Sequence, residues 1–398
     1  MTTTNRISQG EFIALTAALF AMVAISIDAM LPALPQIASA LSPDVPNRAQ
    51  LVITSFVFGM GVGTLFVGPL SDAYGRKPVI YVGAGLYACT ALACYFANSL
   101  DTLLIARVLQ GMSVAAARVV SMAIMRDLFK GREMAKIMSF VMMVFIMVPA
   151  VAPLMGQGII AIAGWQSIFL VYILIVAVIM LWFGLRQQET LALEHRRPLD
   201  LRALWASTRE LFTHRIVRVS IAAQTLTMAA LFASLSSMQG IFEQRFDRAD
   251  SFPLWFAFIA LGSASGSIIN SRVVMRLGMR SVATMAYAAV LTLTLVLLAL
   301  MLSGLMPESL AFPAHVLWSI GLFSMMSMTM GNLNALAMEP VGHIAGLAAS
   351  VMTAVATVLS VVLAVPVGLA FDGTALPLMI GEAAFIAGAL ALMRLIKR

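Results

Sequence analysis

The chain has 398 residues, of which 61% are apolar and only 11% are charged. An ordinary soluble domain carries about 25% charged residues, so this composition excludes a soluble fold. The net charge of +7 is not gathered on a soluble domain or arm, which argues against nucleic acid as a partner, and two cysteines, Cys89 and Cys94, make neither a disulfide framework nor a metal site.

Apolar stretches long enough to cross a bilayer recur along the whole chain. A helix needs about 20 mostly apolar residues to span the hydrocarbon core. We therefore expect an all-α membrane protein with twelve transmembrane helices, surrounded by the lipid bilayer. The expected spans are 12–34, 49–70, 79–97, 102–125, 137–163, 166–185, 218–240, 252–271, 281–303, 310–332, 343–369 and 376–393.

The distribution of Lys and Arg predicts the orientation. Most of the 25 basic residues fall in segments on the same side as the two termini, whereas Arg48, Arg245 and Arg248 lie in loops on the other side. Cytoplasmic loops carry an excess of Lys and Arg. Both termini are therefore expected in the cytoplasm.

The longest polar segment divides the spans into two sets of six. We predict an N-terminal six-helix bundle at 1–185, a cytoplasmic linker at 186–217 and a C-terminal six-helix bundle at 218–398. Short basic turns containing a glycine recur at equivalent places, Tyr74–Lys77 and Leu277–Arg280, which indicates two pseudo-symmetric halves. Transporters are often built from such repeats. An alternative interpretation of the linker is a solvated connector whose charges only fix orientation.

The loop between the second and third spans reads Gly68-Pro69-Leu70-Ser71-Asp72-Ala73-Tyr74-Gly75-Arg76-Lys77-Pro78. It resembles the signature loop of the major facilitator superfamily. Gly68 permits close helix contact, Asp72 can accept from a helix N-terminus or a basic side chain, and Gly75 allows a tight turn. The resemblance implies a gate latch between spans two and eleven that includes Arg76 and Lys77. A loop that only orients the chain is the alternative.

Two more segments resemble motifs of the same superfamily. Arg107-Val108-Leu109-Gln110-Gly111, followed by Arg126 and Asp127, is similar to its fourth-span motif. The stretch from Pro149 to Gly156, with Pro153 inside it, is similar to the fifth-span motif of its proton-coupled drug exporters. The resemblance implies conformational roles for Arg126, Asp127, Pro149, Pro153 and Gly156. A kinked helix that serves packing alone is the alternative.

The first span carries Ser26-Ile27-Asp28-Ala29-Met30-Leu31-Pro32-Ala33-Leu34-Pro35, which resembles drug:proton antiporters of the Bcr/CflA type. The sequence departs from that pattern at Ala29 and Met30, where an aromatic residue is missing. The segment 337–346, which contains Glu339, is also similar to that family. The resemblance implies a monomeric exporter in the bacterial inner membrane, with small molecules and protons as partners and a proton gradient in place of a cofactor.

Buried charges are the candidates for proton coupling. Asp28 lies deep in the first span, where an isolated carboxylate is expensive unless it is protonated, paired or reached by water. Pro32 cannot donate to the carbonyl of Asp28, which leaves that oxygen free. Arg107 reaches nearly the same depth, so we expect it to pair with Asp28 and to switch proton occupancy. A static structural ion pair is the alternative.

Further residues are expected around the substrate or the gate. Asp28, Arg107, Arg118, Met30 and Gln110 are the predicted substrate-binding set. Arg118 returns to the same face of the helix as Arg107 and favours an anionic or zwitterionic substrate, although a side chain that snorkels towards the cytoplasm is equally compatible with the sequence. Glu339 is predicted to be a salt-bridged gate residue.

The second half is predicted to lack a coupling acid. By the offset of the two basic turns, the counterpart of Asp28 is near Leu231. Glu382 and His315 are expected near outer helix ends, at the membrane interface. Coupling is therefore expected to be asymmetric.

The leading function is a proton-coupled antiporter that exports small amphipathic drugs or metabolites by alternating access. The alternatives are a dedicated exporter of an anionic or zwitterionic metabolite or peptide, and a membrane receptor or sensor. An enzyme is not expected, because the four scattered histidines make no zinc motif and no nucleophile motif is present.

Overall fold

The computed structural model describes residues 7–196, 198–199 and 201–396. Within these ranges, twelve helices are long and apolar enough to cross a membrane, which confirms the predicted all-α fold. The first half contains α1 (Gln9–Asp28), η1 (Leu31–Ala33), α2 (Leu34–Leu41), η2 (Pro46–Gln50), α3 (Leu51–Tyr74), α4 (Arg76–Tyr95), α5 (Leu100–Leu128), α6 (Gly131–Ala163) and α7 (Ser167–Arg186). The linker contains η3 (Leu193–His195) and α8 (Leu201–Thr213). The second half contains α9 (Arg215–Gly240), η4 (Ile241–Arg245), α10 (Phe252–Leu277), α11 (Met279–Leu302), α12 (Glu308–Met338), η5 (Glu339–Ile344), α13 (Ala345–Leu369) and α14 (Leu376–Met393).

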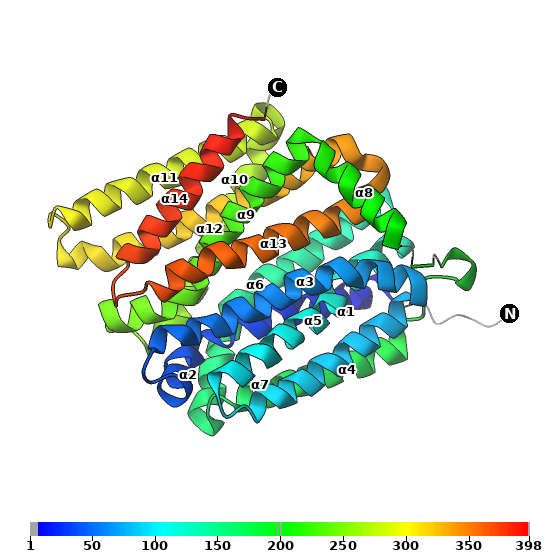
Figure 1. Ribbon diagram of the computed structural model, residues 1–398, viewed down its shortest axis with the longest axis horizontal. Helices are drawn as coiled ribbons and strands as arrows, with labels where there is room; N and C mark the ends of the chain where they lie inside the picture. Colours follow the sequence, from blue (N-terminus) through cyan, green and yellow to red (C-terminus); the bar gives the residue numbers. More distant parts are fainter. Residues whose placement is uncertain (1–6, 197, 200, 397–398) are drawn as a thin grey trace.

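The helices of the two halves lie side by side as two sets (Figure 1). Across the boundary, α3 packs on α13 and α6 packs on α10. The linker helix α8 lies at the same end of the molecule as the two chain termini. We call this the linker end, and the other end, which holds α2 and η4, the far end.

Glycine contacts show the repeat at the level of single residues. In the first half, Gly59 and Gly63, one turn apart on α3, lie against the backbone of Val108 and Met112 on α5. In the second half, a matching pair on α10 lies against residues on α12 that are likewise one turn apart. These contacts are Gly262 with Ile320 and Gly266 with Ser324. Both halves therefore use the same close helix crossing, since small residues let helices approach.

The linker packs against the helices and is more than a solvated connector. Leu211 of α8 is buried in a cluster with Val217, Ala348 and Met352. The exposed side of α8 carries Trp205. The linker therefore forms an amphipathic helix that covers the linker end of α13.

Candidate functional site

The first transmembrane span is broken at Asp28. Helix α1 ends at this residue, and the chain turns through Ala29 and Met30 before η1 and α2 continue to Leu41. Prolines at the starts of η1 and α2 supply no N–H, so the helical hydrogen bonding is interrupted there. The Asp28 side chain is 5% exposed and has no hydrogen bond or ion pair within the described ranges.

Helix α6 presses directly on this break. A Cβ atom on Gly156 would lie 2.1 Å from the carbonyl oxygen of Ala29, so only glycine fits. Pro149 and Pro153 lie within α6, which remains helical from Gly131 to Ala163. The fifth-span motif therefore places its glycine against the residue that follows Asp28.

The predicted ion pair between Asp28 and Arg107 is wrong for this structure. The buried Arg107 guanidinium donates to the Ser26 carbonyl at 2.9 Å, to the Val52 carbonyl at 3.1 Å and to Gln110 Oε1 at 2.7 Å. It also lies over the Phe56 ring, with Cζ 4.3 Å from the centroid. These acceptors engage all three nitrogens of the guanidinium, so Arg107 holds α1, α3 and α5 together.

Two tyrosines complete this arrangement, and the sequence interpretation missed both. Tyr87 and Ser26 share a hydroxyl–hydroxyl hydrogen bond of 2.6 Å, and the Tyr172 hydroxyl donates to the Ile25 carbonyl at 3.1 Å. In the sequence, the only indication of this role is that each tyrosine lies within an apolar span. The last turn of α1 is thus held firmly while the carboxyl of Asp28 is left unbound.

The predicted substrate-binding residues separate into two groups. Met30, Arg107 and Gln110 are 0% exposed, and Gln110 serves as the partner of Arg107, so these three line no accessible cavity in this state and their role in binding substrate stays a prediction. Arg118 is partly exposed within α5, and the structure gives its guanidinium no acceptor among the described residues. Among the residues that the structure describes, Asp28 and Arg118 are the two ionisable members of that set without a partner.

The signature loop forms a charged network at the linker end. Arg76 Nη1 donates to Asp72 at 2.5 Å and to Ser71 at 2.8 Å, and its Nε donates to Asp127 at 3.0 Å. The signature loop is therefore tied to the fourth-span motif. This agrees with the expectation that Asp72 accepts from a basic side chain.

A linker residue that the sequence interpretation missed completes the network. The carboxylate of Glu189 accepts the backbone N–H groups of Arg76 and Lys77 at 3.0 and 2.9 Å, which caps the start of α4. Lys77 Nζ donates to the carbonyls of Gly184 and Gln187. Gly75 has a φ of 102°, and a Cβ there would lie 2.8 Å from Glu189 Oε2, so the turn needs glycine. The linker is thus bound to the signature loop.

The two halves meet at the linker end through small residues. A Cβ on Gly68 of α3 would lie 3.7 Å from Ser350 Oγ of α13, which is ordinary contact between the two helices expected to form the latch. Arg126 lies beside Gly346 at the start of α13. Glu339 is exposed and has no ion pair in the described part of the chain, so the predicted salt bridge is wrong.

At the far end, hydrogen bonds join the halves beside an open groove. Asn47 Nδ2 donates to the carbonyls of Leu369 and Phe371 at 3.0 and 2.6 Å, and Ser237 Oγ donates to Gln50 at 3.4 Å. We call these contacts the far seam. The groove has a volume of about 410 Å³ and is lined from both halves, by residues that include Pro35, Gln50, Ser236, Gln239 and Glu243.

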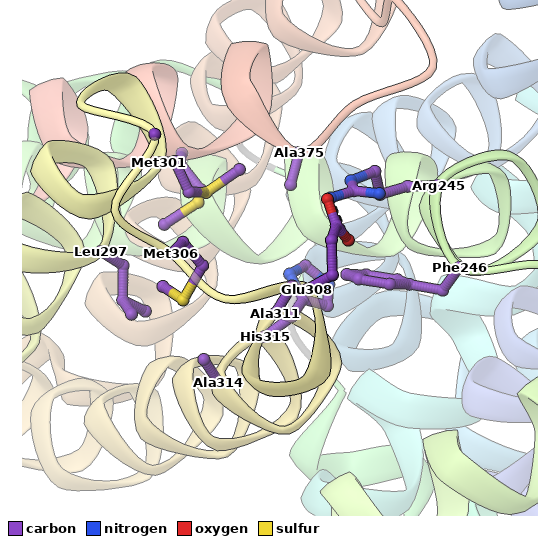
Figure 2. A pocket seen from close by; sticks show the side chains of 12 residues that line it. Arg245, Phe246, Leu297, Met301, Met306, Glu308, Ala311, Ala314, His315 and Ala375 are labelled. Carbon is purple, nitrogen blue, oxygen red and sulfur yellow. Dashed lines mark hydrogen bonds and ion pairs between the residues drawn. The ribbon is translucent and has the colours of Figure 1, made fainter.

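A second pocket lies inside the second half (Figure 2). Its volume is about 220 Å³, and Met301, Met306, Phe246 and His315 line it near the Arg245–Glu308 ion pair of 2.8 Å. His315 is 5% exposed, and its Nε2 is buried without a hydrogen-bond partner in the described chain. His315 lies near the start of α12, as expected, but its ring is enclosed by aromatic side chains within the bundle.

Glu382 is also buried rather than interfacial. Its side chain is 0% exposed and accepts a short hydrogen bond from Ser234 on α9. The second half therefore contains a buried acid, although the counterpart of Asp28 is Leu231, as expected. The error at Glu382 has a physical source: α14 is apolar on all sides, so the sequence does not show which face packs inward.

Comparisons with known proteins agree with this architecture. The model of the Major Facilitator Superfamily matches residues 15–365. The uncharacterized MFS-type transporter YdgK of Bacillus subtilis is 32% identical over 363 residues, which cover 89% of this chain and 87% of that protein. The bicyclomycin resistance protein homolog of Haemophilus influenzae is 32% identical over 66% of each chain, and the multidrug resistance protein MdtL of Escherichia coli O157:H7 is 36% identical over 43% of this chain and 44% of that one.

Solved structures show the same fold. The crystal structure of a D-xylose-proton symporter matches with a TM-score of 0.77 at 13% identity and covers 98% of both chains. The human organic anion transporter MFSD10 matches with a TM-score of 0.66 at 16% identity over 98% of this chain and all of that one. Family model, relatives and fold agree with the signature loop and its charged network. The chain belongs to the major facilitator superfamily.

Proposed function

We propose that this transporter is a proton-coupled antiporter that exports small amphipathic drugs or metabolites by alternating access. The observation that carries the proposal is the unpartnered carboxyl of Asp28, buried where α1 is broken. Broken helices near the middle of the bilayer form substrate and ion sites in transporters. The names of the bicyclomycin-resistance and multidrug-resistance relatives support a drug as the cargo.

The proposed cycle uses Asp28 as the proton carrier. In a closed state the carboxyl has no counter-charge, so it carries a proton. When the cavity opens to the cytoplasm, water reaches the protonated carboxyl, which releases its proton and becomes a hydrated carboxylate. Proton entry supplies about 2.3 kcal/mol per charge for each 100 mV of membrane potential, which is the energy source in place of a cofactor. We also propose that the transporter works as a monomer in the bacterial inner membrane, with both termini in the cytoplasm.

Reconstituted protein tests this function. We expect purified transporter in proteoliposomes with an internal pH-sensitive dye to move protons when bicyclomycin or a multidrug-pump substrate is added, in the direction opposite to the substrate. Resistance profiling in a pump-deficient bacterium selects the substrates to be used. Binding of these compounds with neither flux nor proton movement would instead identify a receptor.

Arg118 supports a second candidate, an exporter of an anionic or zwitterionic metabolite or peptide. Its guanidinium is partly exposed within a membrane span and has no acceptor among the residues described. A substrate carboxylate or phosphate would supply the missing acceptor. In a panel of acidic, neutral and cationic substrates, Arg118→Gln should selectively lose the acidic ones while Arg118→Lys retains part of that transport. An unchanged substrate range in Arg118→Gln would remove this candidate and favour a snorkelling side chain.

A further inference from the structure

The second half contains a carboxyl that the proposed cycle does not use. Glu382 lies within three residues of the middle of α14, about 4 Å along the helix axis, and is 0% exposed. Helices α9, α11 and α13 pack around α14. This position is inside the bundle and near its mid-depth, away from the headgroup region.

The hydrogen bonding of Glu382 is incomplete. Ser234 Oγ donates to Oε1, whereas Oε2 is buried and has no partner in the described part of the chain. A buried carboxylate with one donor and no cation is strongly disfavoured, so the group carries a proton in this state.

In the described chain, the helices packed around α14 supply no compensating charge, although Arg245 and His315 line the pocket that reaches Met379, one turn from Glu382. Helix α13 has no titratable side chain, and Glu382 is the only one within α14. On α9, the titratable groups Arg215 and Arg218 lie in the first turn, at the linker end of the helix. On α11, Arg280 donates to the Met393 carbonyl, and Tyr287 is hydrogen-bonded to Thr227. Beyond the end of α9, Glu243 lines the groove at the far end.

Glu382 contacts α9 close to the position that corresponds to Asp28 in the first half. The glycine contacts that relate α3 to α10 show that the halves repeat, and α9 takes the place of α1. The counterpart of Asp28 is Leu231, and Ser234 lies one turn further along α9. Each half therefore has one buried carboxyl at its first helix. In the first half this carboxyl, Asp28, belongs to the helix itself, whereas in the second half it is Glu382 of α14, which contacts α9.

We propose that Glu382 is a second proton-binding site, which is sealed and protonated in the present state and exchanges its proton with water when α9 moves. Ser234 lies one turn from Ser237, whose hydroxyl bonds Gln50 across the far seam. Parting of the halves at that seam moves α9, displaces Ser234 from Oε1 and opens Oε2 to water on the outward side, from which Glu382 is reloaded with a proton that it releases once the linker end opens to the cytoplasm. The antiporter then exchanges two protons in each cycle, one from each half.

Infrared difference spectroscopy of the purified protein tests whether Glu382 titrates. We expect the carbonyl band of a protonated carboxyl to disappear as the pH is raised in wild-type protein, in Asp28→Asn and in Glu308→Gln, a matched change at an exposed glutamate. The Glu382→Gln protein should lack that band. Ser234→Ala, which keeps the carboxyl, should shift its midpoint and so identify the band even if Glu382→Gln folds poorly. A Glu382 band that persists across the whole pH range in which the wild type transports would show a permanent structural hydrogen bond and overturn the inference.

The proton stoichiometry tests the role of Glu382 in the transport cycle. This role rests on the proposed antiport. From reversal potentials in proteoliposomes, Glu382→Gln should exchange one proton fewer per substrate than wild type. An unchanged stoichiometry in Glu382→Gln would overturn the second site while leaving antiport intact. If the wild type moved no protons with any substrate, the proposed antiport itself would be wrong, so the two failures are distinguishable.

Discussion

A methyl group placed on Gly156 would lie 2.1 Å from the carbonyl oxygen of Ala29, the residue that follows Asp28. The fifth-span motif thus controls how closely α6 approaches the broken part of the first span. A substitution at this contact is therefore expected to shift Asp28, the proposed proton carrier.

Gly156→Ala should therefore weaken both folding and transport. Crowding a packed contact destabilises by about 1–3 kcal/mol, and here the backbone around Asp28 has to move. Thermal unfolding in detergent and substrate flux in proteoliposomes measure the two effects. Gly158→Ala is the matched control, because the same helix offers open space at that position. Equal stability and flux in the two variants would contradict the contact.

Arg107→Lys should lose stability although the charge is kept. A lysine cannot reproduce the planar guanidinium that reaches Ser26, Val52 and Gln110, and each buried acceptor left without a donor costs about 1–3 kcal/mol. Arg48→Lys, at an exposed ion pair with Asp101, should leave the unfolding temperature unchanged. If Arg107→Lys were as stable as wild type, the proposed bracing role would be wrong.

Glu189→Ala should release the linker from the signature loop. The carboxylate caps α4 through the N–H groups of Arg76 and Lys77, and loss of a cap costs about 1 kcal/mol. Hydrogen exchange should become faster at the start of α4, and limited trypsin digestion should cut the linker sooner. Glu194→Ala, at an exposed linker residue without such contacts, should change neither measurement. Identical digestion of both variants would exclude this role for Glu189.

The sequence predicted the parts of the fold that depend on hydropathy and local chemistry. Twelve spans were predictable because each needs its own apolar length. Pro32 indicated that the carbonyl of Asp28 lacks a helical donor, but the end of α1 at Asp28 was not predicted. The repeated basic turns indicated two halves, and the contacts of Gly59 and Gly262 bear this out. These features depend on residues close together in the sequence.

Side-chain partners were less predictable. Equal depth suggested an ion pair of Asp28 with Arg107, but depth does not reveal that backbone carbonyls at Ser26 and Val52 accept from the guanidinium first. Glu189 lies in the predicted linker 186–217, but its role was not predictable, since a cap supplied from more than 100 residues away leaves no local pattern. Partners of this kind depend on how distant helices pack.

The most direct test of the account is substrate-driven proton flux in Asp28→Asn, compared with Asp101→Asn. Asparagine keeps the size of the side chain and removes the proton-carrying group, and Asp101 is an exposed aspartate whose change controls for the substitution itself. We expect Asp28→Asn to fold and bind substrate but to lose proton-coupled flux, with Asp101→Asn at the wild-type level. Wild-type proton-coupled flux from a folded Asp28→Asn protein would contradict the central claim that Asp28 carries the coupled proton.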